Sequence, residues 1–146
     1  MPAPSLLLVA LFGSALTCTA PHVHDGDTIT CDHQRVRLWG IDAPELDRSP
    51  RCRTGGGWAC DRAAMAWGIA ARDRLIALTR GQVVCEQRDT DRYHRVVAHC
   101  TSAGIDLDRL MVREGLARDY TRYSHGAYLT DETRARRERV GMWNGQ

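Results

Sequence analysis

The amino-acid sequence predicts an α+β domain: a five-stranded β-barrel of the oligonucleotide/oligosaccharide-binding (OB) type with three helices. Three observations indicate this fold. Three short strand patterns lie after residue 20, an alanine-rich helical pattern follows them, and two apolar strands then precede two further helices. This order is typical of a five-stranded OB barrel with added helices, an architecture that commonly binds nucleic acid. With 146 residues, the chain is long enough for one domain with a substantial core.

The strands are marked by a hairpin signal and by alternation. Residues 25–26 are Asp-Gly, a typical two-residue hairpin turn between two extended segments. In the next segment Arg35, Arg37 and Trp39 alternate with apolar residues, as in a half-buried strand. Further along, two short apolar runs are joined by a charged turn at residues 88–95. The predicted strands are residues 22–24, 28–31, 35–41, 83–86 and 96–100.

Three segments are expected to be helical. The longest is rich in alanine and places Met65, Ile69 and Ile76 on one stripe. Each of the three segments is followed by a glycine, which is a common residue just beyond the end of a helix. The predicted helices are residues 60–80, 107–114 and 130–140.

The first 20 residues contain no charged side chain and carry an apolar run from Leu6 to Leu11. This pattern resembles a short secretory signal, and it is shorter than the roughly 20 apolar residues that span a bilayer. We expect a signal segment at residues 1–17 and a folded domain at residues 18–146; the cleavage site stays open because the segment has no Lys or Arg and a cut after Ala20 would place Pro21 next. The protein is therefore expected to be secreted or periplasmic.

Six cysteines in a small exported protein indicate three disulfides. Their order favours sequential pairing, although other connectivities are possible. The middle pair would close a polar loop at residues 47–58, which is rich in Gly and Arg and has no periodicity. Two alternatives are a zinc site, disfavoured because no CxxC pair is present, and a lipid anchor on Cys18, disfavoured by Thr17. The expected pairs are Cys18–Cys31, Cys52–Cys60 and Cys85–Cys100.

The net charge of +2 is low for a dedicated nucleic-acid-binding protein, which is usually far more basic. Any capture of phosphate must therefore be local. All 20 basic residues are arginine, a bias typical of GC-rich coding. Arginine nevertheless presents a planar fork of donors that binds phosphate in a bidentate manner.

Asp27 and Asp42 are the candidate ligands of a hard cation. Ca²⁺ takes about 6–8 oxygen ligands, so two carboxylates leave room for a backbone carbonyl, waters and a substrate phosphate. Ala43 precedes Pro44 and is biased toward extended geometry, which allows its carbonyl to face the ion. The alternative for Asp27 is a plain hairpin turn. The alternative for Asp42 is a capping box with Glu45, but no helical stripe follows it.

Arg37, Glu45 and Arg95 are the candidate catalytic residues. Hydrolysis of a phosphodiester requires an activated water and donors for the charge that develops on the phosphate. Glu45 suits the orientation or deprotonation of that water, and the permanently charged Arg37 and Arg95 suit the phosphate oxygens. Arg35 lies on the same strand face as Arg37 and is expected to be a surface charge.

Two tyrosines are candidate substrate-binding residues. Tyr93 lies in the charged turn and Tyr120 follows the second helix, so either can stack on a base or contact a phosphate. Structural roles are the alternative for both. The six histidines show no ligand spacing beyond His22 and His24, and we interpret them as structural.

Taken together, these residues resemble the staphylococcal nuclease family. The resemblance implies Ca²⁺ bound by Asp27, Asp42 and the carbonyl of Ala43, with Arg37, Glu45 and Arg95 as catalytic residues. It also implies an endonuclease that acts on DNA and RNA, cuts the 5′ ester bond and leaves 3′-phosphates. Five motifs in the family's order carry the resemblance, and they lie at residues 23–28, 37–45, 91–95, 110–117 and 141–143.

The chain departs from the family at His94, where glycine is frequent, and in the loop after Glu45, which the Cys52–Cys60 pair would clasp. Both departures bear on rate and substrate preference. The rival hypothesis is a non-catalytic OB-type nucleic-acid-binding module, but retention of all the charged site residues favours catalysis. We expect a monomer with DNA and RNA as substrates and no stable protein partner.

Overall fold

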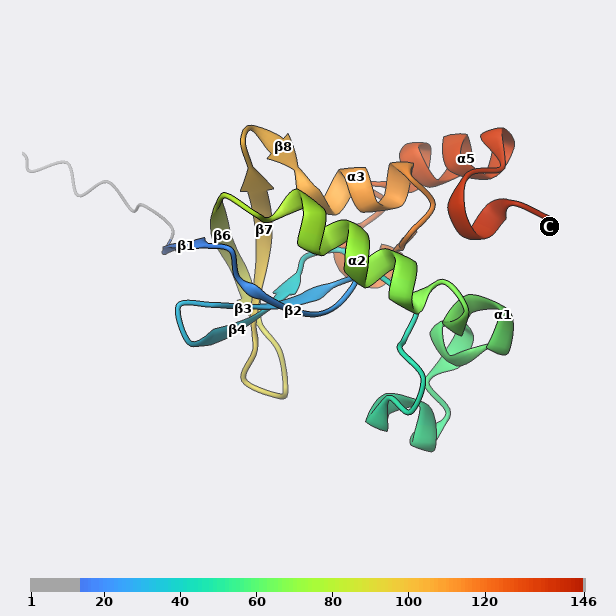
Figure 1. Cartoon of the computed structure of the whole chain (residues 1–146), viewed down its shortest axis with the longest axis horizontal. Coiled ribbons are helices and arrows are strands. Elements are labelled where there is room, and N and C mark those ends of the chain that lie inside the picture. Colours follow the sequence, from blue (N-terminus) through green and yellow to red (C-terminus); the bar gives the residue numbers. More distant parts are fainter. Residues whose placement is uncertain (1–13, 146) are drawn as a thin grey trace, which may run out of the picture.

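The computed structural model describes residues 14–145 and shows a curled β-sheet flanked by helices (Figure 1). The strand order is β1-β6-β7-β4-β3-β2, with β8 beside β7, and only the β4–β7 pair is parallel. A separate two-stranded sheet pairs β5 with β9. The strands are β1 Ala15–Thr19, β2 His22–Asp25, β3 Thr28–Cys31, β4 Gln34–Leu38, β5 Ile41–Asp42, β6 Gln82–Thr90, β7 Val96–Ser102, β8 Ile105–Asp106 and β9 Arg118–Asp119.

The helices pack around this sheet and around one another. Helix α2 packs against β2, whereas α3 packs against both β7 and α5. The predicted α+β class with an OB-like curled sheet is confirmed, although the described chain has more strands than the five expected. The helices are α1 Arg62–Met65, α2 Gly68–Leu78, α3 Leu107–Arg113, α4 Thr121–Ser124 and α5 Leu129–Glu138, and the 3₁₀ turns are η1 Pro50–Thr54, η2 Gly57–Cys60 and η3 Gly141–Trp143.

The core lies between the sheet and helices α2 and α3. Alternation in β3 and β4 turns Ile29, Val36 and Leu38 inward, where all three are fully buried. Leu75 of α2 and Met111 of α3 are fully buried in the same cluster. This packing fixes the strand ends from which the candidate site is built.

The prediction of one continuous helix at residues 60–80 is wrong. The chain forms α1 and α2, with a break at residues 66–67. The predicted stripe is also wrong, because Ile69 and Ile76 are 57% and 43% exposed, whereas Ala71 and Leu75 face the core. The break reflects tertiary structure: α2 begins at Gly68, which lies so close to the Glu45 carbonyl that a Cβ would overlap its oxygen.

The first strand was not predicted. β1 begins at Ala15 and pairs with β6 from Ala15 opposite Glu86 to Thr19 opposite Gln82. Its first three residues fall within the segment expected to be a signal, most of which lies outside the described residues. The boundary between residues 17 and 18 therefore stays a prediction. No helix within residues 14–145 has the length and apolar character needed to cross a membrane.

The three predicted disulfides are all present. Cys18–Cys31 links β1 to β3, and Cys85–Cys100 joins residues that lie opposite each other in β6 and β7. Cys52–Cys60 clasps the loop after Glu45, whose backbone forms the two 3₁₀ turns η1 and η2. Because Cys18 is disulfide-bonded, its thiol is not available for a lipid anchor in this structure.

Asp108 is a fully buried carboxyl group at the start of α3. Its Oδ2 accepts a hydrogen bond from the Cys100 N–H at 2.9 Å, whereas its Oδ1 has no partner among the described residues. Burial raises the pKa of Asp108 well above its ordinary value. The folded protein therefore holds Asp108 protonated at pH values where the unfolded chain ionises it.

We predict that Asp108→Asn raises the melting temperature at pH 7, by roughly 3 °C or more. Protonation of Asp108 contributes stability that is fully present below its unfolded pKa and is lost as the pH rises through its folded pKa. Asparagine does not ionise, so the variant does not lose stability in this way as the pH rises. The increase in melting temperature over the wild type should therefore be larger at pH 7 than at pH 4. Thermal melts at both pH values test this, with the exposed Asp47→Asn as the control; equal effects of both variants would contradict it.

Candidate active site

Asp27, Arg37 and Asp42 come together because their strands run side by side. In the β3–β4 pairing, Thr28 lies opposite Arg37. The Leu38 N–H donates to the Asp27 carbonyl oxygen at 2.8 Å and holds the β2–β3 turn against β4. The chain then turns into β5, which ends at Asp42. Strand pairing thus brings both aspartates to the same arginine.

The Arg37 guanidinium bridges the two aspartates. Its Nη1 lies 3.2 Å from Asp27 Oδ1, and its Nη2 lies 3.0 Å from Asp42 Oδ1. Nη2 also donates to the Ile41 carbonyl oxygen at 3.2 Å, and only 14% of the side chain is exposed. Burial opposes the charge, but the two carboxylates outweigh it and raise the pKa of Arg37 above its ordinary value. Arg37 is therefore a fixed cation with donors aimed into the site.

Asp27 is held as an ionised carboxylate. Its Oδ2 accepts from the Ala43 N–H at 2.8 Å and its Oδ1 from the Thr28 hydroxyl at 3.0 Å. Burial works against ionisation, but the charge of Arg37 and these donors lower the pKa of Asp27. Burial and the nearby Asp27 raise the pKa of Asp25 to about 8. The turn therefore pairs an ionised Asp27 with an Asp25 that is mostly protonated at pH 7.

Glu45 is buried just beyond β5, and its position is fixed by backbone contacts. Its N–H donates to the Ala59 carbonyl oxygen at 2.9 Å, and its carbonyl lies against Gly68 at the start of α2. Its Oε2 accepts a hydrogen bond from the Ser49 hydroxyl at 2.7 Å. Helix α2 and the clasped loop together position this carboxylate beside Asp42.

Arg51 is a site residue that sequence reasoning missed. Its Nη1 lies 2.8 Å from Asp42 Oδ1 and 3.1 Å from Glu45 Oε1, and its Nη2 donates to Asp42 Oδ2 at 3.3 Å. The hydrogen bond to Asp42 is the main reason that the pKa of Arg51 is raised above its ordinary value. The sequence does not distinguish Arg51 from Arg48 and Arg53 in the same loop, except that Arg51 is next to Cys52.

Trp58 is a second missed residue. Its indole Nε1–H donates to Asp42 Oδ2 at 3.0 Å. Behind it, the Arg118 guanidinium lies 4.1 Å from the Trp58 ring centroid and 4.9 Å from that of Trp143. This stack supports the indole that binds Asp42 Oδ2, whereas Arg37 binds Oδ1.

Arg95 makes no hydrogen bond or ion pair with the carboxylate cluster formed by Asp27, Asp42 and Glu45 among the described residues. Its Nε donates to Asp91 Oδ2 at 2.7 Å in the β6–β7 turn. It lies one residue before Val96, which pairs with Val36 of β4. His94 precedes Arg95 and has a φ of 61°, a left-handed conformation that favours glycine. The turn therefore keeps this conformation with histidine in the place where glycine was expected. Arg95 thus lies at the end of the turn, immediately before the strand that pairs with β4, and it is restrained by Asp91.

The two candidate tyrosines differ in their placement. Tyr120 lies beside the cluster, with its ring centroid 5.9 Å from Arg37 Cζ and 4.8 Å from the Tyr123 ring. Tyr93 is 63% exposed in the β6–β7 turn and accepts a hydrogen bond from Arg92 at 2.8 Å. Tyr120 is thus near Arg37, whereas Tyr93 lies against Arg95, whose Cζ is 5.5 Å from the Tyr93 ring centroid.

The carboxylate cluster suits a hard cation by its chemistry. Oxygens of Asp42 and Glu45 converge on one cationic nitrogen of Arg51, and Asp27 joins them through Arg37. Hard oxygen donors of this kind are what Ca²⁺ prefers. Asp27 and Asp42 would hold the ion with the carbonyl of Ala43, whose residue is buried beside them.

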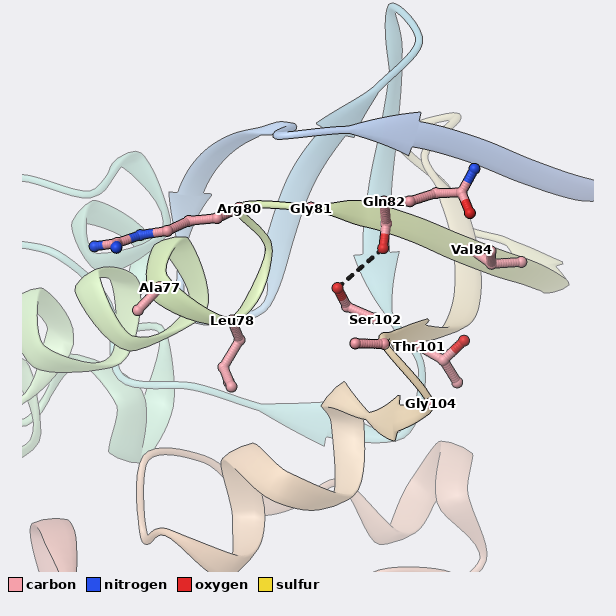
Figure 2. A pocket seen from close by; sticks show the side chains of 10 residues that line it. Ala77, Leu78, Arg80, Gly81, Gln82, Val84, Thr101, Ser102 and Gly104 are labelled. Atoms are coloured by element: carbon pink, nitrogen blue, oxygen red, sulfur yellow. Dashed lines mark hydrogen bonds between the residues drawn. The ribbon is translucent and has the colours of Figure 1, made fainter.

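Two other features lie apart from this cluster. Single ligand atoms of His99, Asp106 and Asp108 lie within 4.8 Å of one another, but His99 and Asp106 already pair with each other at 3.1 Å. A pocket of about 460 Å³ lies between the end of α2 and strands β6 and β7 (Figure 2). No carboxylate lines it, and Figure 2 shows the Ser102 hydroxyl bonded to the Gln82 carbonyl oxygen inside it. The pocket therefore offers none of the carboxylate donors found among Asp27, Asp42 and Glu45.

Comparison with known proteins gives a consistent assignment. Residues 35–145 match the family described as staphylococcal nuclease homologue. Micrococcal nuclease of Shigella flexneri is 34% identical over 137 residues, which cover 82% of this chain and 69% of that protein. An uncharacterized endonuclease of Haemophilus influenzae is 30% identical over 151 residues, covering 95% of this chain and 75% of that protein.

A further relative is not named as a nuclease. Succinoglycan biosynthesis protein ExoI of Rhizobium meliloti is 31% identical over 125 residues. The alignment covers 85% of this chain but 63% of that protein, so the present chain spans less than two thirds of its length. The family match covers the segment that carries Arg37, Asp42, Glu45 and Arg95, and the expected resemblance is confirmed. The chain belongs to the staphylococcal nuclease family of phosphodiester hydrolases.

Proposed function

We propose that the protein is a Ca²⁺-dependent, sugar-nonspecific endonuclease that hydrolyses DNA and RNA to products with 3′-phosphates. The observation that carries this proposal is the convergence of three buried carboxylates: Asp27 and Asp42 on Arg37, and Asp42 and Glu45 on Arg51. Buried charges are costly unless they are paired, and their retention here favours a chemical role over a structural one.

The roles follow from the geometry. Glu45 orients an attacking water and takes a proton from it, while Arg37 donates to a non-bridging phosphate oxygen as negative charge develops. The water oxygen forms a bond to phosphorus, the bond from phosphorus to the 5′ oxygen breaks, and the leaving 5′ oxygen takes up a proton from solvent water to become a hydroxyl. Arg95 contacts the phosphate after leaving Asp91, and Tyr120 and Tyr93 offer stacking surfaces for bases. Bound Ca²⁺ would supply Lewis-acid polarisation of the phosphate.

The proposal extends to location and assembly. Three disulfides are typical of proteins from oxidising compartments, which supports a secreted or periplasmic protein. We also propose a monomer that acts on nucleic acid and has no stable protein partner.

The products test this function. Single-stranded DNA and RNA are incubated with the oxidised protein and Ca²⁺, and the fragments are labelled with polynucleotide kinase without prior phosphatase treatment. Cleavage of the 5′ ester bond leaves 5′-hydroxyl ends, so both substrates should give labelled fragments. Fragments that take up label only after phosphatase treatment would contradict the proposed bond. Binding of both polymers without cleavage would favour the non-catalytic OB-type module.

A further inference from the structure

Asp42 has no acceptor capacity left for a cation. A carboxylate offers about four lone-pair sites. In Asp42, Oδ1 accepts from Arg37 at 3.0 Å and from Arg51 at 2.8 Å, and Oδ2 accepts from Arg51 at 3.3 Å and from Trp58 at 3.0 Å. A metal ion can therefore bind Asp42 only if one of these donors leaves.

Arg51 is the donor that can leave. Arg37 also binds Asp27 and the Ile41 carbonyl, and only 14% of its side chain is exposed. The Arg51 guanidinium donates hydrogen bonds only to Asp42 and Glu45 among the described residues, and 36% of its side chain is exposed. Moving the guanidinium toward solvent breaks no other hydrogen bond of the side chain in this part of the chain.

The loop presents Arg51 to the cluster in a defined way. Arg51 lies in η1, next to Cys52, whose disulfide to Cys60 closes the loop. The Arg51 stem packs against Gly56, where a Cβ would lie 2.9 Å from Arg51 Cγ. The neighbouring Arg53 is exposed on the same turn and makes no ion pair among the described residues. Of these two loop arginines, only Arg51 therefore places its guanidinium at the carboxylates.

Charge balance favours the exchange. Asp27, Asp42 and Glu45 carry three negative charges, which Arg37 and Arg51 neutralise only in part. A divalent ion in place of the Arg51 guanidinium would complete the neutralisation, with Arg37 left in position. The two arrangements differ mainly in which cation, the Arg51 guanidinium or the metal ion, binds Asp42.

We propose that Arg51 is a built-in competitor for the metal: its guanidinium occupies acceptor positions of Asp42 that Ca²⁺ would need, and it is displaced when Ca²⁺ binds. This inference rests on the proposed function, since it takes Asp42, with Asp27 and the Ala43 carbonyl, as the calcium site. Arg51 holds the carboxylates together while the ion is absent, and it raises the Ca²⁺ concentration needed to load the site.

Calorimetric titration of the oxidised protein with CaCl₂, without nucleic acid, tests the competition. Removal of a competing charge about 3 Å from two carboxylates should tighten binding, and we expect Arg51→Gln to lower the Kd for Ca²⁺ by about tenfold or more. Arg51→Lys keeps the charge without the fork and should fall between Arg51→Gln and the wild type. Arg53→Gln is the matched control and should leave the Kd unchanged.

Thermal melts add a second measurement. In EGTA, Arg51→Gln should melt below the wild type, because Asp42 and Glu45 lose their counter-charge, and its rise in melting temperature on adding Ca²⁺ should be larger. A Kd for Arg51→Gln equal to or weaker than that of a wild type that binds Ca²⁺ would overturn this inference alone. Absence of Ca²⁺ binding by both proteins would overturn it together with the proposed calcium dependence.

Discussion

Replacing Arg37 with alanine is expected to reduce phosphodiester cleavage by roughly 10³-fold or more, the scale of losing a preorganised donor to a developing oxyanion. Arg37 is nearly buried, and its two Nη atoms lie 3.2 and 3.0 Å from Asp27 and Asp42. Its loss removes the phosphate donor and also leaves the two aspartates without their shared counter-charge. Initial rates on single-stranded DNA, with circular dichroism to confirm folding, measure the effect.

Arg35 provides the matched control for Arg37. It lies two residues earlier in β4, is exposed, and makes no ion pair among the described residues. Arg35→Ala should therefore cleave at nearly the wild-type rate. Arg37→Lys keeps the charge but not the planar fork, and we expect it to stay far below wild type. A folded Arg37→Ala variant with near-normal activity would show that the phosphate donor lies elsewhere.

Gly68→Ala is expected to lower activity by about 100-fold, because displacement of a catalytic group by about 1 Å has an effect of that size. A Cβ at this position would overlap the Glu45 carbonyl oxygen and lie 2.9 Å from its carbonyl carbon. The new methyl group meets backbone atoms, so either α2 or the Glu45 segment must move. Cleavage rates and Ca²⁺ affinity, measured on the same sample, report whether the Glu45 carboxylate has shifted.

Gly81 is the comparison for Gly68. It follows the end of α2, and a Cβ there would meet no atom within 4 Å. Gly81→Ala should be silent in activity and neutral or slightly stabilising, by up to about 1 kcal/mol. If Gly68→Ala were as silent as Gly81→Ala, the close contact between α2 and Glu45 would have no role in positioning the carboxylate.

The predicted part of the site was local in the sequence. Asp27, Arg37 and Asp42 lie at a hairpin turn or in short strands that alternation and turn residues mark, so pairing of adjacent strands was enough to bring them together. Arg51 and Trp58 were not predicted as site residues. Both belong to a loop without periodicity, and their contacts with Asp42 depend on how the Cys52–Cys60 disulfide folds that loop.

The errors in the fold have comparable physical causes. The break before Gly68 results from a contact with Glu45, and no local propensity in an alanine-rich segment indicates it. An apolar strand such as β1 and the end of a secretory signal share the same composition, so residues 15–17 fit both. Arg95 was predicted to contact the phosphate; its salt bridge to Asp91 forms within its own turn, and its role stays a prediction.

The most direct test of the account is the initial rate at which the oxidised protein cleaves single-stranded DNA in Ca²⁺, in EGTA and with Glu45→Ser. The carboxylate cluster predicts cleavage that requires both Ca²⁺ and Glu45, with Glu45→Ser still folded and binding DNA. Cleavage that persists in EGTA or in Glu45→Ser, or DNA binding without cleavage under every divalent ion, would contradict the account.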